Sequence, residues 1–158
     1  MEELLSYAVK EDIIKTVLRN HNVIFLSGWS RTGKTISLLK SLQSIDMRLY
    51  FSHSKESQRV AQSADPDIQI IGSLSSFRGV GSEESILIID DFSTANEDTK
   101  QEIIRFLSER PSNLKIVLIV RAFIDIKNLI PLADALLRLK KSTAEIIYSI
   151  WQERGKDD

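Results

Sequence analysis

The sequence contains no cysteine, and its 21 basic and 22 acidic residues nearly cancel, leaving a formal net charge of −1. Without cysteine the chain can form neither disulfide bonds nor a cysteine-ligated zinc site. Because the charge is nearly balanced, we expect no overall electrostatic attraction to nucleic acid, although a local basic patch is compatible with this balance. Internal repeats and low-complexity tracts are also missing.

Long apolar runs are missing as well, and no segment approaches the length that a membrane-spanning helix needs. The first five residues, Met1-Glu2-Glu3-Leu4-Leu5, are acidic, unlike a secretory signal. We therefore expect a cytoplasmic protein with no membrane partner. At 158 residues, of which 42% are hydrophobic and 27% charged, the chain has the composition of an ordinary globular protein, and we expect one domain over residues 1–158.

The apolar residues follow helical and strand-like spacings in alternation. Helical spacing predicts an amphipathic helix over residues 3–20, helices over 55–64 and 95–109, and one between about 125 and 134 interrupted near Pro131. Short apolar runs predict strands over residues 22–27, 47–52, 68–71, 85–91, 114–120, 135–139 and 144–151, with a Ser/Gly-rich loop over 72–84. This order predicts a three-layer α/β fold with a mostly parallel central sheet flanked by helices. Ligands of such sheets bind beyond the carboxyl ends of the strands.

The most informative motif lies between the first predicted strand and the helix after it. Residues 28–35 read Gly28-Trp29-Ser30-Arg31-Thr32-Gly33-Lys34-Thr35, the G-x-x-x-x-G-K-[ST] phosphate-binding loop known as Walker A. Its glycines let backbone N–H groups point at an anion, and the following helix adds the positive end of its dipole. Lys34 would reach the β- and γ-phosphates, and the Thr35 hydroxyl would ligate Mg²⁺. We expect residues Gly28 to Ile36 to bind a nucleotide.

Asp90 ends the apolar run Ile86-Leu87-Ile88-Ile89, which is the pattern of a Walker B aspartate. Such a residue holds Mg²⁺ through water, here opposite Thr35. The alternative is an aspartate that caps the next turn, as is common where strands end. Because the phosphate-binding loop is present, we favour the metal role.

Hydrolysis also needs an acidic group that orients the attacking water. In one group of P-loop ATPases this acid directly follows the Walker B aspartate, where this chain has Asp91. In another group it lies after the strand that follows the phosphate-loop helix, where this chain has Glu56 in Ser52-His53-Ser54-Lys55-Glu56-Ser57. Glu56 could equally be a solvent-facing residue of the first helical turn. We favour Glu56 and keep Asp91 as the alternative.

From about residue 20 to 155 the chain resembles the RecA-like branch of P-loop ATPases, which contains RecA, DnaB and KaiC. The resemblance includes Arg48-Leu49-Tyr50-Phe51-Ser52 with Lys55-Glu56-Ser57, and Ile88-Ile89-Asp90-Asp91-Phe92-Ser93. It continues in Leu132-Ala133-Asp134-Ala135-Leu136-Leu137-Arg138-Leu139, and in Glu145-Ile146-Ile147 through Glu153-Arg154-Gly155. The resemblance implies a RecA-like ATPase core over residues 21–155, an N-terminal helix over 1–20, and ATP and Mg²⁺ as ligands.

Some positions depart from the family pattern. Gln152 replaces the lysine of the closing K-x-R-G, so a catalytic finger supplied to a neighbouring subunit would depend on Arg154 alone. Arg121 follows the 114–120 strand, where the family often has a polar sensor, and could read the γ-phosphate or pair with a local carboxylate. For Lys140-Lys141 we favour a solvated strand edge over a role in a neighbour's site.

The resemblance implies an ATPase that assembles into a ring or filament and acts in DNA metabolism as a recombination, helicase or loader accessory protein. The sequence itself shows no nucleic-acid-binding signature. One alternative is a slowly hydrolysing, ATP-dependent switch that signals through a protein partner, with residues 72–84 as a responsive loop. Another is an AAA+-like ATPase with Asp91 as the catalytic acid, although strand-like C-terminal runs stand where a helical lid is expected. The third alternative is a structural subunit that retains the fold but does not hydrolyse ATP.

Overall fold

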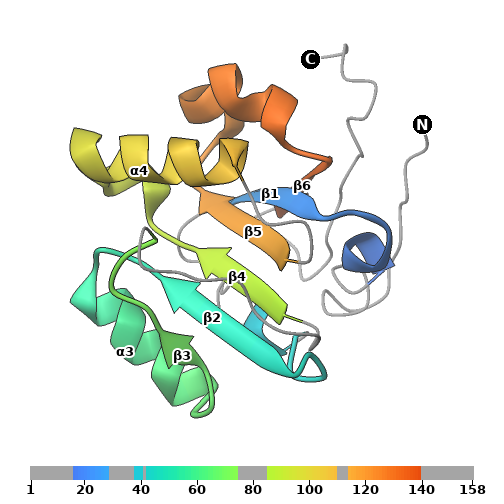
Figure 1. Cartoon of the computed structure of the whole chain (residues 1–158), viewed down its shortest axis with the longest axis vertical. Helices are drawn as coiled ribbons and strands as arrows, with labels where there is room; N and C mark the ends of the chain where they lie inside the picture. Colours follow the sequence, from blue (N-terminus) through green and yellow to red (C-terminus); the bar gives the residue numbers. More distant parts are fainter. Residues whose placement is uncertain (1–15, 29–37, 41, 75–84, 110–113, 140–158) are drawn as a thin grey trace.

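A computed structural model of the chain describes residues 16–28, 38–40, 42–74, 85–109 and 114–139. They form an α/β fold with one six-stranded sheet (Figure 1). The strands are β1 (Val23–Gly28), β2 (Met47–Phe51), β3 (Gln69–Ile70), β4 (Ser85–Ile89), β5 (Leu114–Val120) and β6 (Ala135–Leu139). Their order in the sheet is β3-β2-β4-β5-β1-β6, and every neighbouring pair is parallel. The predicted α/β class with a parallel sheet is therefore confirmed.

Two regular α-helices follow strands, α3 (Lys55–Ala64) and α4 (Glu97–Ser108), and each begins at a polar cap. The Ser54 hydroxyl accepts a hydrogen bond from the Ser57 N–H at 3.1 Å, and the Asn96 side-chain oxygen accepts one from the Thr99 N–H at 2.8 Å. Such caps satisfy N–H groups that have no partner within the helix. The helix predicted over 55–64 has these bounds, and the one predicted over 95–109 is shorter at both ends.

The helix predicted between residues 125 and 134 is instead the 3₁₀ segment η2 (Phe123–Leu132), with non-helical backbone at Ile126. Pro131 lies inside it, and proline cannot supply the N–H that an α-helical turn needs. A shorter 3₁₀ turn, η1 (Phe92–Thr94), follows β4. Of the helix predicted over 3–20, residues 16–20 are described and helical. The strand predicted over 144–151 and most of the 72–84 loop lie outside the described residues.

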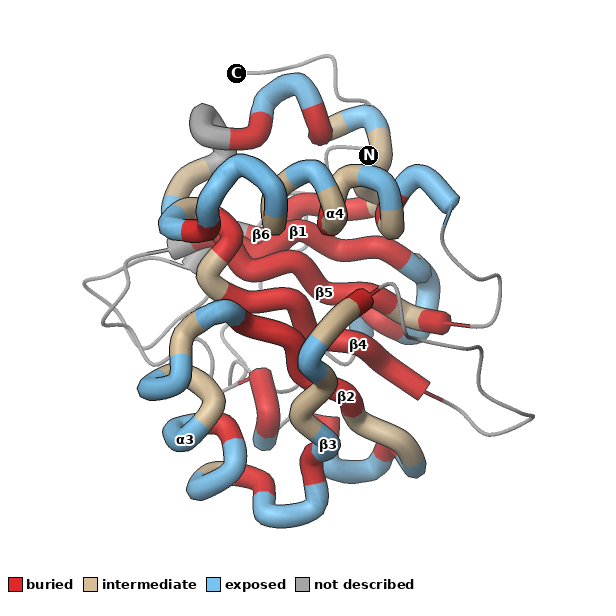
Figure 2. The backbone as a smooth tube through the Cα atoms, turned by 60° about the vertical axis from the view of Figure 1, so that its left-hand side comes forward, coloured by how far each residue is buried: buried red, intermediate tan, exposed pale blue. Residues whose placement is uncertain are grey.

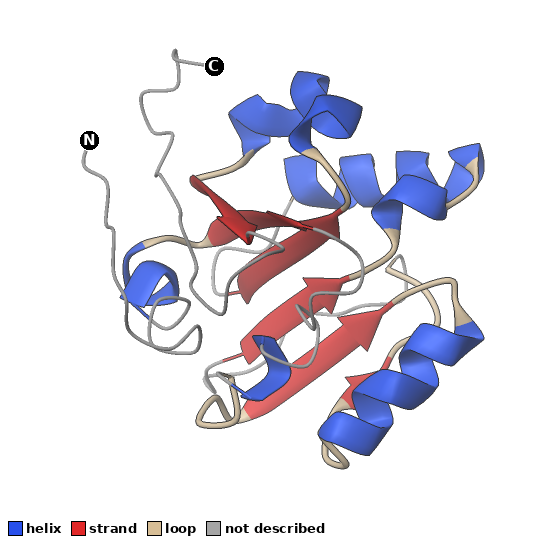
Figure 3. Cartoon of the chain, turned by 180° about the vertical axis from the view of Figure 1, so that it is seen from behind, coloured by secondary structure: helices blue, strands red, loops and turns tan. Residues whose placement is uncertain are grey.

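The helices cover both faces of the sheet, which Figure 3 shows from behind. Residues 16–20, residues 38–40 and α3 pack on the face that we call the α3 face, through Val17, Leu18, Leu38, Leu39 and Ala61. The other face, the α4 face, is covered by α4 and η2 through Ile103, Leu107, Ile126 and Leu129. The connection from β2 to β3 runs across the sheet in the direction opposite to that from β4 to β5. Crossovers of one hand then place α3 and α4 on opposite faces.

Strand residues divide between these two faces by alternation. In β1, for example, Ile24 and Leu26 belong to the α3-face core, and Val23 and Phe25 to the α4-face core. Both sets are buried, so the central strands are predominantly apolar, as a parallel sheet covered on two faces requires (Figure 2). In the described part of the chain no helix is long and apolar enough to cross a membrane.

Candidate functional site

Because all six strands are parallel, their carboxyl ends lie along one edge of the sheet, which we call the carboxyl edge. β1 ends there at Gly28, the first residue of the predicted phosphate-binding loop. β5 lies between β1 and β4, so the ends of β1 and β4 are separated by two strand spacings, roughly 10 Å. The other predicted loop residues, including Lys34 and Thr35, lie outside the described residues.

Asp90 follows β4 at this edge and is only 8% exposed. The Tyr50 hydroxyl donates to Asp90 Oδ2 at 2.6 Å, and the Asp91 N–H donates to Asp90 Oδ1 at 2.8 Å. The Asp90 N–H in turn donates to the Phe51 carbonyl at 2.9 Å. Ile86 and Ile88 belong to the α3-face core, so alternation places Asp90 on the same face as residues 38–40. The predicted metal ligand is therefore held in one orientation, on the same face of the sheet as residues 38–40.

Tyr50 is a residue whose part in this site the sequence analysis did not identify. Its ring is fully buried in the α3-face core, between the sheet and α3. Burial, then the charge of Asp90 and the hydrogen bond to it, raise the pKa of Tyr50 far above its ordinary value. The phenol is therefore a hydrogen-bond donor at every physiological pH. The sequence did contain a signal for this contact, because a tyrosine inside a predicted buried strand needs a hydrogen-bond partner for its hydroxyl.

Asp91 has a left-handed backbone, with φ 62° and ψ 32°, and no other non-glycine residue in the described ranges has a positive φ. Aspartate tolerates this conformation better than most residues. The turn ends the alternation of β4, and the half-buried Asp91 carboxylate accepts a hydrogen bond from the Ser52 hydroxyl. Ser52 also accepts from the Ser54 N–H at 3.0 Å, which connects Asp91 to the cap of α3.

Glu56 lies in the first turn of α3 and is exposed. It lines a pocket of about 510 Å³ together with Lys40, Arg59, Val60, Ser63 and Ala64. Within the described ranges its carboxylate makes no hydrogen bond or ion pair, and it does not contact Asp90 or Asp91. The structure thus brings Asp90 and Asp91 into one hydrogen-bonded group and places Glu56 on a neighbouring surface.

Two further candidates at the carboxyl edge lie on loops. His53 Nε2 and Thr94 Oγ1 are 3.0 Å apart, so the loop after β2 contacts η1. Arg121 follows β5, is exposed, and donates its backbone N–H to Ser93 Oγ at 3.2 Å. No carboxylate in the described part of the chain pairs with its guanidinium. Arg154, Gln152 and Lys140-Lys141 lie outside the described residues.

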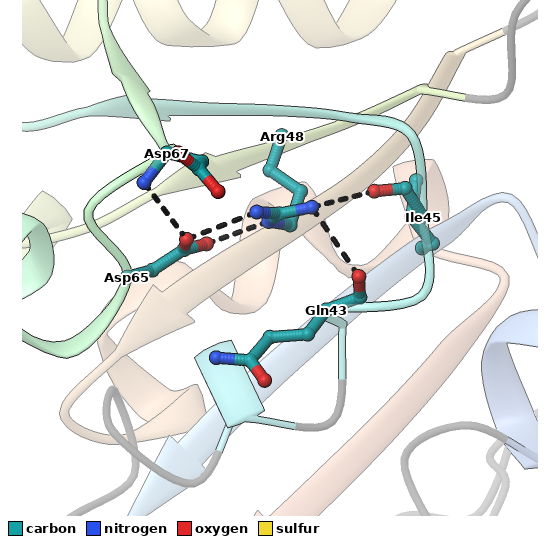
Figure 4. A network of polar contacts seen from close by, with 5 residues as sticks. All are labelled: Gln43, Ile45, Arg48, Asp65 and Asp67. Atoms are coloured by element: carbon teal, nitrogen blue, oxygen red, sulfur yellow. Dashed lines mark hydrogen bonds and ion pairs between the residues drawn. The ribbon is translucent and has the colours of Figure 1, made fainter.

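At the opposite edge, which we call the amino edge, Arg48 and Asp65 form a bidentate ion pair (Figure 4). Arg48 Nε is 2.6 Å from Asp65 Oδ2, and Nη2 is 2.9 Å from Oδ1. Arg48 Nη1 also donates to the carbonyls of Ile45 at 2.7 Å and Gln43 at 3.4 Å. The hydrogen bond from Arg48 lowers the pKa of Asp65, and the same bond raises that of Arg48. The two side chains are 9% and 3% exposed, so this pair belongs to the folded core.

Asp134, part of the segment that resembles the RecA-like family, also lies at the amino edge. Its Oδ2 accepts from the backbone N–H groups of Asn22 at 3.1 Å and Val23 at 3.0 Å, where β1 begins. Nearby, Lys115 Nζ in β5 donates to the Leu18 carbonyl at 2.6 Å. These bonds hold the start of the strand whose other end leads into the motif.

Within the described ranges no group of three or more His, Asp and Glu side chains is arranged to hold a metal ion. Mg²⁺ that binds together with a nucleotide usually takes one or two protein carboxylates and completes its shell with phosphate oxygens and water. The oxygen chemistry and fixed orientation of Asp90 fit such a partial site. No protein-family model matches the chain, and no curated protein matches it.

Proposed function

We propose that this chain binds ATP with Mg²⁺ at the carboxyl edge and hydrolyses it to ADP and phosphate, as a P-loop ATPase of the RecA-like group. One observation carries the proposal: β1 ends at the first glycine of the G-x-x-x-x-G-K-T motif, and Asp90 stands at the same edge. Asp90 also faces the side of the sheet on which the helix after the motif packs. This is where open parallel sheets bind ligands.

Each part of the edge has its own proposed task. The backbone N–H groups of the loop and Lys34 would bind the phosphates, and Thr35 and Asp90 would hold the cation. Two strand spacings, roughly 10 Å, separate the ends of β1 and β4, which leaves room for a phosphate and a hydrated cation. Mg²⁺, when bound, neutralises charge on the phosphate oxygens.

The acid that orients the water is proposed to be Glu56, with Asp91 as the alternative. Asp91 adjoins Asp90 and has a fixed carboxylate, and Glu56 is exposed on α3. Glu56→Gln and Asp91→Asn separate the two assignments, because each removes the charge and keeps the size. If Asp91→Asn alone abolishes turnover, the AAA+-like alternative replaces the RecA-like assignment.

A slowly hydrolysing switch is the second candidate. The two candidate acids differ in setting, since the Ser52 hydroxyl donates to Asp91 and Glu56 is exposed and lines an outer pocket. A chain without one clearly placed acid is expected to hydrolyse ATP slowly. A protein of this kind would bind ATP tightly and signal through a protein partner. The resemblance to RecA-like proteins supports the motor alternative, a ring or filament that acts on DNA.

The decisive experiment measures ATP binding and turnover of the full chain with and without DNA, together with its oligomeric state. Lys34→Ala should abolish both binding and turnover, and Lys127→Ala is a matched exposed control. Turnover stimulated by single-stranded or duplex DNA supports the motor. Tight ATP binding with slow, DNA-independent turnover supports the switch. If no nucleotide binds in the presence of Mg²⁺, the proposal is wrong.

A further inference from the structure

The two acidic residues after β4 are each held by a hydroxyl from β2. The Tyr50 hydroxyl donates to Asp90, and the Ser52 hydroxyl donates to Asp91. The register of β2 and β4 explains these pairs, because Phe51 stands opposite Ile89. The residues on either side of Phe51, Tyr50 and Ser52, therefore lie next to the end of β4. The two successive carboxylates therefore have separate, neutral donors.

Tyr50 does more than fill the core, because its hydroxyl donates to the Asp90 carboxylate at 2.6 Å. The ring is fully buried and Asp90 is only 8% exposed, so bulk water does not readily replace this contact. A hydrogen bond from a buried, fixed donor restricts the Asp90 carboxylate to one rotamer, which a ligand of a small cation requires.

We propose that Tyr50 is a positioning residue for the cation site, holding the Asp90 carboxylate in the orientation that binds Mg²⁺ beside ATP. This inference rests on the proposed function and adds to it the residue on which the affinity for the cation depends. Tyr50 touches neither nucleotide nor cation; it acts through Asp90. Its loss should therefore weaken Mg²⁺ binding and leave the phosphate-binding loop intact.

The test is a titration of the ATP-bound protein with Mg²⁺, monitored by tryptophan fluorescence in a Trp151→Phe background. Trp29, which belongs to the motif, is then the only tryptophan in the sequence, and its fluorescence reports Mg²⁺ binding. In Tyr50→Phe the Mg²⁺ concentration for half-maximal response should rise about tenfold, the usual effect of losing a partner of a metal ligand. ATP binding without Mg²⁺ should not change. Ser52→Ala is the matched control, because it removes the hydroxyl that donates to Asp91 instead of Asp90. It should leave the Mg²⁺ concentration for half-maximal response, the Mg²⁺ midpoint, unchanged.

The outcomes separate this inference from the proposed function. A wild-type protein with no Mg²⁺-dependent response to ATP overturns the proposed function. A wild-type response with an unchanged midpoint in Tyr50→Phe, or with equal shifts in Tyr50→Phe and Ser52→Ala, overturns only the role of Tyr50. In an Asp90→Asn background Tyr50→Phe should have no further effect on the midpoint, because it acts through Asp90.

A measurement on the unsubstituted side chains does not depend on whether Tyr50→Phe folds. Tyrosine labelled with ¹³C at Cζ gives one signal for each of the three tyrosines, Tyr7, Tyr50 and Tyr148. The Tyr50 signal should shift when Mg²⁺ is added to the complex with ATP. A Tyr50 signal that stays in place while Trp29 reports Mg²⁺ binding contradicts the inference.

Discussion

At the amino edge of the sheet the Asp65 carboxylate is paired with Arg48, whereas at the carboxyl edge Asp90 and Asp91 accept hydrogen bonds from hydroxyl groups and a backbone N–H. The ion pair balances its own charge, and its remaining donors satisfy nearby carbonyls. A phenol, a serine hydroxyl and a backbone N–H fix the direction of the two aspartates at the carboxyl edge. The amino edge thus pairs its charges within the fold, and the carboxyl edge holds two acidic side chains in fixed directions where the strands end.

This comparison predicts that substitutions at the amino edge lower stability and that substitutions at the carboxyl edge lower activity. The largest effect is expected for Asp65→Ala, which should reduce the free energy of unfolding by about 3–5 kcal/mol, since a buried guanidinium loses its partner. Urea denaturation measures it. Asp67→Ala removes an exposed carboxylate from the same turn and should cost no more than about 0.5 kcal/mol. Equal losses in the two variants would show that the ion pair does not stabilise the fold.

Asp90→Asn is expected to have the next largest effect, on activity. It should reduce kcat/KM for ATP with Mg²⁺ by roughly 100-fold, because a neutral amide replaces the charge that holds the cation. The melting temperature should fall only modestly, since the amide oxygen can still accept from Tyr50, although the amide NH2 cannot accept from the Asp91 N–H. Asp98→Asn, an exposed substitution in the first turn of α4, is the control in the steady-state assay. A large loss of stability without loss of activity would show that Asp90 stabilises the fold, as Asp65 does, and does not bind the cation.

The left-handed turn at Asp91 allows a smaller, sharper test. Asp91→Gly and Asp91→Ala both remove the carboxylate, but only alanine keeps a Cβ in this conformation. Asp91→Ala should be less stable than Asp91→Gly by about 1 kcal/mol in denaturant unfolding. Turnover should be equal in the two variants, because both lack the Asp91 carboxylate. Equal stability would mean that the backbone at residue 91 relaxes out of the left-handed region.

The smallest effect is a dependence on pH. Arg48 lowers the pKa of Asp65 in the folded state. The stabilisation that the ion pair provides is therefore complete above the unfolded pKa of about 3.9, and it is lost as the pH falls through the folded pKa. The difference in unfolding free energy between the wild type and the double variant Arg48→Met/Asp65→Leu should be constant from pH 7 to about 5. Below about pH 4 the wild type should lose stability relative to the double variant. A constant difference down to pH 2 would contradict the ion pair.

The sequence predicted the elements well where a local signal existed. The start of α3 follows Ser54, a capping residue, and β5 coincides with a run that is apolar except for Lys115. η2 was predicted as an interrupted helix and is a 3₁₀ segment, because the spacing of apolar residues does not distinguish the two.

The contacts of the candidate site were less predictable. Asp90 was identified because it ends an apolar run, a local pattern. Tyr50 was missed because its partner lies 40 residues away in sequence, and the two meet only when β2 and β4 pair. Arg48 and Asp65 are 17 residues apart and were missed for the same reason, since a helix must first return the chain to the amino edge.

The sequence by itself therefore determined the alternation of strands and helices, the G-x-x-x-x-G-K-T pattern and the aspartates after β4, because hydrophobic period and motif spacing are properties of neighbouring residues. Only the tertiary structure decided that β5 separates β1 from β4, that Asp90 shares a face with residues 38–40, and that Tyr50 and Ser52 hold the two carboxylates. Strand order and register depend on contacts between distant segments, and no local pattern encodes them.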